Sequence, residues 1–162
     1  MAATTAASSF RVFVYGSLLR GLHNHHLLAK SKLVAAARTA QPAYVLIDSG
    51  HGFPYAVADA RARQEDCRVA LLGEIYEVDT AVLSRLDELE EHPTWYQRRE
   101  VEVSAADEPA ARAWIYLLES DDELAKIAKD PKAYRPVTTQ GDWRAHLQAD
   151  PSYAAAAAAL DT

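Results

Sequence analysis

The sequence predicts a single α+β domain whose mostly antiparallel or mixed sheet can curl into a small barrel. Its 162 residues, 49% apolar and 25% charged, have the length and composition of an ordinary globular domain with its own core. Short runs of β-branched and aromatic residues alternate irregularly with helical segments, which separates this class from strictly alternating α/β folds. The sequence contains no internal repeat and no sign of a second domain.

Six stretches have the residue types and lengths of strands: 10–15, 43–47, 54–58, 67–78, 96–104 and 112–118. The last two, joined by a turn at 105–111, predict a β-hairpin. Gly73 interrupts the fourth stretch, which indicates a bulge or the close approach of another backbone. Helices are expected from about Asn24, whose side chain can cap the first turn, at 121–129, and after Gly141.

The segment from Asp79 to Arg99 predicts an amphipathic helix followed by a strand. Asp79 or Thr80 can cap the helix start, because a short oxygen-bearing side chain accepts a hydrogen bond from an unpaired backbone N–H. Pro93 ends the helix. Four apolar residues repeat at helical spacing, namely Val82, Leu83, Leu86 and Leu89. With about 100° of rotation per residue, they fall within an arc of roughly 120°, and Glu90 falls inside it.

Glu90 is therefore the candidate functional residue of this helix, whose other late acids, Asp87, Glu88 and Glu91, point outside the apolar arc. A carboxylate facing an apolar surface costs several kcal/mol unless it is paired, hydrogen-bonded or protonated, and such local conflicts gather at functional sites. The alternative is structural. Glu90 lies in the last turn, where its side chain can reach solvent or pair with Arg98 or Arg99.

Charge and cysteine content exclude several classes of protein. A net charge of −6 gives no basic surface for nucleic acid or an anionic membrane, and no apolar run is long enough to span a bilayer. The single cysteine, Cys67, cannot form an internal disulfide and is expected to be a small buried residue in a strand. These features, with no secretory signal in the first nine residues, predict a cytoplasmic protein.

The expected domain organisation is simple. Residues 1–9 are predicted to form a disordered N-terminal tail, residues 10–150 a single domain, and residues 151–162 an alanine-rich C-terminal tail with little to bury.

The loop Tyr15-Gly16-Ser17-Leu18-Leu19-Arg20 follows the first predicted strand. A glycine and successive free N–H groups at a strand end can form an anion-binding nest, to which Arg20 would add positive charge. An ordinary strand-to-loop turn is the alternative. The spacing matches neither a nucleophile elbow nor a phosphate-binding loop, so nothing marks Ser17 as a nucleophile.

Histidines and aromatic residues give weaker signals. His23, His25 and His26 form a cluster, but without cysteines, an HExxH spacing or a matching pair of acids they predict loop residues rather than a metal site. Aromatic residues in strands are usually part of the core. If a pocket exists, the hydroxyls of Tyr96 and Tyr116 are the aromatic groups that we expect to face it.

Two separated motifs resemble the γ-glutamylcyclotransferase-like superfamily, which includes γ-glutamylcyclotransferase, γ-glutamylamine cyclotransferase and avirulence-induced plant proteins. The family's strand-end signature is similar to Tyr15 to Leu18. Its pattern LD-x-hydrophobic-E, followed by Pro and Y-x-R, is similar to Leu86 to Arg98 and places the family acid at Glu90. Trp114-Ile115-Tyr116 and the GDWR segment at 141–144 also look like parts of the family. The resemblance covers most of residues 10–147.

The resemblance implies a small barrel-like mixed sheet with a cavity, and a reaction that converts a γ-glutamyl amino acid or amine to 5-oxoproline and a free amine. Glu90 would take a proton from the substrate α-amine and pass it to the leaving amine. No metal or cofactor is required. The residues implied in substrate binding are Tyr15, Gly16, Ser17, Leu18, Leu19, Arg20, Tyr96 and Tyr116.

Two other functions stay open. The first keeps Glu90 but changes the substrate to a γ-glutamylamine such as an ε-(γ-glutamyl)lysine crosslink. The second is a non-catalytic module that binds a small molecule in the same cavity, because a shared fold does not guarantee activity. In each case the expected partner is a small molecule, with no nucleic acid and no membrane, and the protein is expected to be a monomer or weak homodimer.

Overall fold

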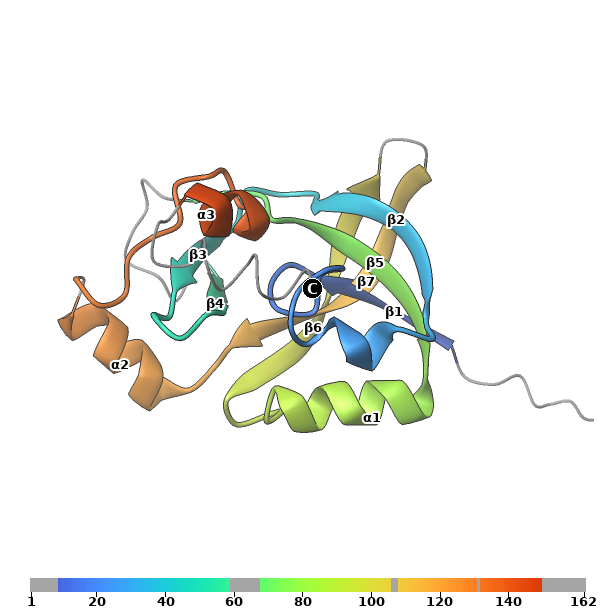
Figure 1. Ribbon diagram of the computed structural model, residues 1–162, viewed down its shortest axis with the longest axis horizontal. Helices are drawn as coiled ribbons and strands as arrows, with labels where there is room; N and C mark the ends of the chain where they lie inside the picture. Colours follow the sequence, from blue (N-terminus) through green and yellow to red (C-terminus); the bar gives the residue numbers. More distant parts are fainter. Residues whose placement is uncertain (1–8, 59–67, 106–107, 131, 150–162) are drawn as a thin grey trace, which may run out of the picture.

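The centre of the protein is a closed five-stranded barrel in the order β1-β5-β2-β6-β7 (Figure 1). The computed structural model describes residues 9–58, 68–105, 108–130 and 132–149. The barrel strands are β1 (Ser9–Val14), β2 (Lys32–Thr39), β5 (Leu72–Asp79), β6 (Tyr96–Ala105) and β7 (Glu108–Leu118). A separate hairpin consists of β3 (Tyr44–Asp48) and β4 (Pro54–Ala58).

Strand pairing makes the barrel mixed but mostly antiparallel. β5 pairs antiparallel with β1 and β2, β6 pairs antiparallel with β2 and β7, and the barrel closes through a parallel contact between β1 and β7 at Val12 and Trp114. The predicted fold class is therefore confirmed. Because β1 and β7 run in the same direction, the residues that follow β1 lie beside the last part of β7.

The described residues form four short helices: a 3₁₀ helix η1 (His25–Leu28), α1 (Thr80–Leu89), α2 (Asp121–Lys129) and α3 (Trp143–Ala149). η1 and α1 lie at one side of the barrel, whereas α2 and α3 flank the β3–β4 hairpin (Figure 1). The Asp79 carboxylate caps α1 by accepting from the Val82 N–H at 2.8 Å, which confirms one of the two predicted caps. The predicted side-chain cap at Asn24 is wrong, because its amide donates to the Ser17 hydroxyl instead.

Two strand predictions need correction. β2 was not predicted, because its sequence KLVAAART is rich in alanine and has few of the residues that favour strands. Its pairing with β5 and β6 supplies the stability that the residue types lack. β5 begins at Leu72 rather than at 67, and Val69 makes only an isolated bridge to Tyr44. Cys67 and both predicted tails, apart from Ser9 in β1, lie outside the described residues.

Apolar side chains from both sheets form a continuous core. The largest fully buried side chains include Trp143, Tyr55, Phe13, Leu46, Leu86 and Ile115. Trp143 and Leu147 occupy the same side of α3 and are both buried, as the sequence predicts. In the part of the chain that the structure describes, no helix has the length and apolar character needed to cross a membrane.

Gly73 allows β1 and β5 to approach closely where β1 ends. A Cβ atom at this position would lie 2.0 Å from the Val14 carbonyl oxygen and 2.8 Å from the Phe13 ring. The predicted close approach of another backbone is therefore confirmed. The end of β1, and with it the start of the loop at Tyr15, depends on the absence of a side chain at residue 73.

Replacing Gly73 by Ala should destabilise the protein. The added methyl group must push β1 away from β5, and overpacking of this kind costs about 1–3 kcal/mol. Urea unfolding measures the loss, and Ser104→Ala, at an exposed position on β6, serves as a control that should change the free energy of unfolding by less than about 0.5 kcal/mol. Equal stability of Gly73→Ala and wild type would contradict the close approach.

Candidate active site

A cavity of about 250 Å³ lies at the end of the barrel where β1 stops and β6 begins. This volume is slightly below the range of roughly 300–1,000 Å³ that is usual for ligand pockets, so it suits a small group. The walls come from the end of β1 and its loop, the start of β4, the end of α1, and the facing parts of β6 and β7. The lining residues are Phe13, Val14, Tyr15, Gly16, Ser17, Leu18, Asn24, Phe53, Pro54, Leu89, Glu90, Glu91, Trp95, Tyr96 and Tyr116.

The backbone holds Glu90 in a defined place at the end of α1. The helix stops at Leu89, so Glu90 is the C-cap residue rather than a member of the last turn. Its N–H donates to the Leu86 carbonyl at 2.9 Å, and its own carbonyl accepts from the Tyr96 N–H at 3.1 Å. The side chain is thereby directed into the cavity wall between α1 and β6.

The Glu90 carboxyl group has no hydrogen-bond or ion-pair partner among the described residues. Burial in this mostly apolar wall raises its pKa to about 7, because the charged form is poorly solvated there. The two cations that could have neutralised it are engaged elsewhere. Arg98 pairs with Asp87 at 2.8 Å, and Arg99 pairs with Glu119. The structural alternative, in which Glu90 pairs with one of these arginines, is therefore wrong.

The loop after β1 contains backbone N–H groups that lie beside the cavity without a protein partner in the described part of the chain. Within the described residues, the N–H groups of Gly16, Ser17 and Leu18 have no protein acceptor, and all three residues line the cavity. Leu19 and Arg20 do not line it. Leu19 is 2% exposed in the core, and the Arg20 N–H donates to Glu74 at 2.9 Å. The part of the loop that lines the cavity is thus shorter than predicted, and Arg20 does not belong to it.

Three buried tyrosines, Tyr15, Tyr96 and Tyr116, form part of the cavity wall. The Tyr15 hydroxyl donates to the Tyr116 carbonyl at 2.5 Å, and the Tyr96 hydroxyl donates to the Pro54 carbonyl at 3.2 Å. Burial raises the pKa of both hydroxyls well above the usual value, and the nearby charge of Glu90 adds to this effect. Burial and the hydrogen bond to Asp87 raise the pKa of Tyr116 as well. All three tyrosines therefore stay protonated at neutral pH, and each donates its hydroxyl proton to a protein acceptor.

Asp87 is a residue of the site region that the sequence interpretation missed. The helical-wheel analysis placed it outside the apolar arc, yet its carboxylate accepts from the Tyr116 hydroxyl at 2.7 Å and from Arg98. Burial alone would raise the pKa of Asp87, but these hydrogen bonds outweigh burial and lower it. Arg98 in turn lies over the Trp114 ring at 4.8 Å. The Asp87–Arg98 ion pair, through the hydrogen bond from the Tyr116 hydroxyl to Asp87, fixes the Tyr116 side chain beside the cavity.

Other cavity-lining residues were not predicted as site residues. They are Phe13, Val14, Asn24, Phe53, Pro54, Leu89, Glu91 and Trp95, and of these Leu89, Glu91 and Trp95 lie within the motif from Leu86 to Arg98. Among the described residues, the lining contains no lysine or arginine. The histidine cluster has structural contacts instead: His25 donates to the Leu18 carbonyl, and His26 contacts the His23 carbonyl.

Comparison with known proteins identifies the class to which this fold and cavity belong. The family model for gamma-glutamyl cyclotransferase, AIG2-like proteins matches residues 12–145. The chain therefore belongs to this family and is an enzyme of the cyclotransferase type, which confirms the resemblance seen in the two motifs.

Individual relatives support the same assignment. The chain is 32% identical over 130 residues to the gamma-L-glutamyl-butirosin B gamma-glutamyl cyclotransferase of Niallia circulans, covering 76% of each chain. It is 29% identical over 141 residues to gamma-glutamylaminecyclotransferase C of Danio rerio, covering 84% of this chain and 81% of the relative. The crystal structure of an AIG2-like protein from Mus musculus matches the fold with a TM-score of 0.58 and 24% identity, covering 69% of this chain and 78% of that one.

The raised pKa of Glu90 predicts a pH-dependent cost to stability. Because this pKa is higher in the folded protein than the ordinary value of 4.5, the cost is absent below pH 4.5, grows as pH rises, and is complete above pH 7. Glu90→Gln should therefore gain stability over wild type between pH 4 and pH 8, by at most about 3 kcal/mol.

Urea unfolding of both proteins across this pH range measures the gain. Glu88→Gln, at an exposed position of α1, controls for the loss of one negative charge. A stability difference between Glu90→Gln and wild type that stays constant with pH would contradict the burial of this carboxyl group.

Proposed function

We propose that this protein cyclises γ-glutamyl compounds to 5-oxoproline and releases the attached amine, with Glu90 as the general base and acid. The observation that carries the proposal is the unpaired Glu90 carboxyl group, which shares one cavity with the free N–H groups of Gly16 to Leu18. A base with a pKa of about 7 is well matched to proton transfer near neutral pH. The free N–H groups suit the carboxylate of an amino acid.

The reaction follows from this arrangement. The substrate α-carboxylate binds the N–H groups of the loop, which orients its α-ammonium group toward Glu90. The Glu90 carboxylate takes one proton from the ammonium group, and the freed amine attacks the γ-carbonyl carbon. The resulting tetrahedral intermediate collapses as Glu90 returns the proton to the departing nitrogen. The ring nitrogen, which still carries two hydrogens, then loses one proton, which ends on the released amine as its ammonium form. A new C–N bond closes the five-membered ring, and the original amide C–N bond breaks.

Glu90→Gln tests this role directly. The amide retains the size of the side chain but cannot accept the proton, so release of 5-oxoproline should fall by about 10²–10⁴-fold or become undetectable. The wild-type kcat/KM should rise with pH through an apparent pKa of about 7, as Glu90 ionises. Mass spectrometry of 5-oxoproline from a panel of γ-glutamyl dipeptides, γ-glutamylamines and glutathione measures both effects.

Glu88→Gln is the matched control and should retain wild-type rates. Full activity of Glu90→Gln would remove Glu90 from the mechanism. Absence of 5-oxoproline from every substrate, with the wild-type protein folded, would favour the non-catalytic binding module.

A second observation favours γ-glutamylamines within this substrate class. In the part of the chain that the structure describes, the cavity lining contains no lysine or arginine, and it includes Glu91 next to Glu90. Glu91 is exposed and has a left-handed backbone conformation with φ of 51°. A leaving group with its own carboxylate, as in a γ-glutamyl amino acid, would be repelled by the Glu91 carboxylate and would find no cation in the described lining. A neutral or positively charged amine is not repelled by Glu91. The name of the Danio rerio relative is consistent with a γ-glutamylamine substrate.

Charge at the leaving group should therefore control the rate. We expect kcat/KM to decrease in the order γ-glutamyl diaminobutane, γ-glutamyl butylamine, γ-glutamyl alanine. Glu91→Gln should reduce the preference for the diamine over the butylamine by about 2–5-fold, as expected for an exposed charge interaction of up to about 1 kcal/mol. A wild-type preference for γ-glutamyl alanine would reverse the proposed selectivity.

A further inference from the structure

The GDWR segment at 141–144 is a sequence motif to which the proposed reaction gives no role, and none of its residues lines the cavity. Each residue nevertheless has a specific place. Gly141 has φ of 78°, and a Cβ atom there would lie 2.4 Å from the Ala70 carbonyl oxygen. The Asp142 carboxylate accepts an N–H hydrogen bond from the first turn of α3, and Trp143 is completely buried. These contacts fix the position from which the last residue of the motif extends.

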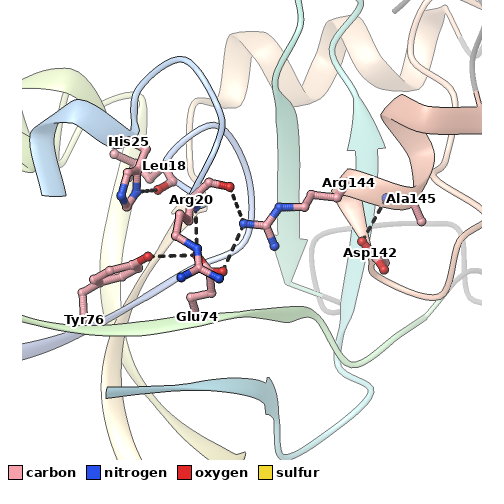
Figure 2. Close-up of polar contacts among 8 residues, drawn as sticks. All are labelled: Leu18, Arg20, His25, Glu74, Tyr76, Asp142, Arg144 and Ala145. Carbon is pink, nitrogen blue, oxygen red and sulfur yellow. Dashed lines mark hydrogen bonds and ion pairs between the residues drawn. The ribbon is translucent and has the colours of Figure 1, made fainter. Parts of the chain in front are cut away.

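Arg144 reaches from α3 to the loop that follows β1 (Figure 2). Its Nη2 donates to the Glu74 carboxylate at 3.0 Å and to the Arg20 carbonyl at 2.5 Å. The other Glu74 oxygen accepts from the Arg20 N–H at 2.9 Å. The backbone of Arg20 is thus held through both its N–H and its carbonyl by one ion pair. This ion pair joins β5 and α3, which are far apart in the sequence.

A second set of contacts holds the same loop nearer the cavity (Figure 2). The Tyr76 hydroxyl donates to Glu74 at 3.0 Å, and the Tyr76 ring packs against His25 with a centroid distance of 5.6 Å. His25 Nδ1 donates to the Leu18 carbonyl at 3.0 Å, because a carbonyl can only accept. Glu74 therefore lies at the centre of contacts that reach two peptide groups of the loop.

Glu74 stays ionised in this arrangement. It is 7% exposed, and burial alone would raise its pKa, but hydrogen bonds from the Arg20 N–H, Arg144 and Tyr76 lower it instead. A buried carboxylate with these donors forms strong, directional, charge-assisted bonds. The ion pair therefore remains formed over the pH range in which Glu90 titrates.

We propose that Glu74 and Arg144 are positioning residues for the cyclotransferase reaction: together they orient the loop so that the N–H groups of Gly16 to Leu18 face the cavity. This inference rests on the proposed function of that loop in binding the substrate α-carboxylate. Burial of Leu18 and Leu19 keeps the loop near the barrel, but apolar contacts do not set the rotation of its peptide groups. Within the loop, the Gly16 and Ser17 carbonyls accept from the Leu19 and Asn24 N–H groups. The bonds to the Leu18 carbonyl and to Arg20 hold the peptide groups that follow, so that all these hydrogen bonds together set the rotation.

The experiment compares Arg144→Ala and Arg144→Lys with the matched control Arg38→Ala. Arg38 donates to the carbonyl groups of Ala70 and Gln140. It therefore holds the backbone just before the GDWR segment and, among the described residues, makes no hydrogen bond to the loop after β1. Each change is made in the wild type, for kinetics, and in Glu90→Gln, for binding of the intact γ-glutamyl substrate by calorimetry. Nitrogen-15 amide spectra of the same proteins report the loop and the fold without substrate.

Arg144→Ala should raise KM, and the Kd measured in the Glu90→Gln background, by about tenfold or more, because the loss affects ground-state binding. The kcat value and the apparent pKa of the rate profile should change little. Arg144→Lys should recover part of the affinity, since it retains the charge but loses the planar fork. Amide signals of Gly16 to Leu18 should shift in Arg144→Ala, whereas Arg38→Ala should resemble wild type in every measurement.

Unchanged KM and unchanged loop signals in Arg144→Ala would overturn the inference, as would an equal effect of Arg38→Ala. If Arg144→Ala does not fold, Arg144→Lys decides the question by the same two measurements. If the wild type releases no 5-oxoproline from any substrate, the proposed function fails. The amide spectra still decide whether Glu74 and Arg144 orient the loop.

Discussion

The Glu90 carboxyl group lies in a cavity wall without a protein partner among the described residues. The neighbouring residues hold the Glu90 backbone in place and pair with the cations that could have neutralised the carboxyl group. The Glu90 N–H donates to the Leu86 carbonyl and the Glu90 carbonyl accepts from the Tyr96 N–H, so the backbone of Glu90 is fixed at the junction of α1 and β6. Arg98 could have neutralised it, but Arg98 pairs with Asp87 and supports Tyr116 instead. The carboxyl group therefore keeps a pKa near 7, which costs stability above pH 4.5 but gives a base suited to neutral pH.

The barrel places the second half of the site against this acid. β1 and β7 run parallel where the barrel closes, so the loop after β1 lies beside the end of β7, where Tyr116 is located. Gly73 allows the end of β1 to lie close to β5. Glu74 accepts a hydrogen bond from the Arg20 N–H of this loop and pairs with Arg144 of the last described helix. Segments from the start and middle of the described chain thus line one small cavity, and a helix at the end of the described chain contacts the loop beside that cavity.

The sequence predicted those features that depend on local patterns. Helical periodicity singled out Glu90, residue types predicted most strands, and of the two candidates for the α1 cap, Asp79 is the one that caps the helix. β2 was missed, because an alanine-rich strand is stabilised by its neighbours rather than by its own residues. Asp87 and Glu74 were missed for a related reason. Their partners, Tyr116 and Arg144, are 29 and 70 residues away, and only the folded chain brings them together. Arg20 was expected at the cavity from its place in the motif, but Glu74 takes its N–H.

The most direct test of the account is the titration of Glu90 itself. Carbon-13 labelling of glutamate side chains, with Glu90→Gln to assign the signal, allows the Glu90 carboxyl resonance to be followed by NMR from pH 3 to pH 9. The account predicts a midpoint of about pH 7, caused by burial without a charged partner. A midpoint near the ordinary value of 4.5 would mean that solvent or a cation stabilises the charged form, and would contradict the assignment of Glu90 as a base matched to neutral pH.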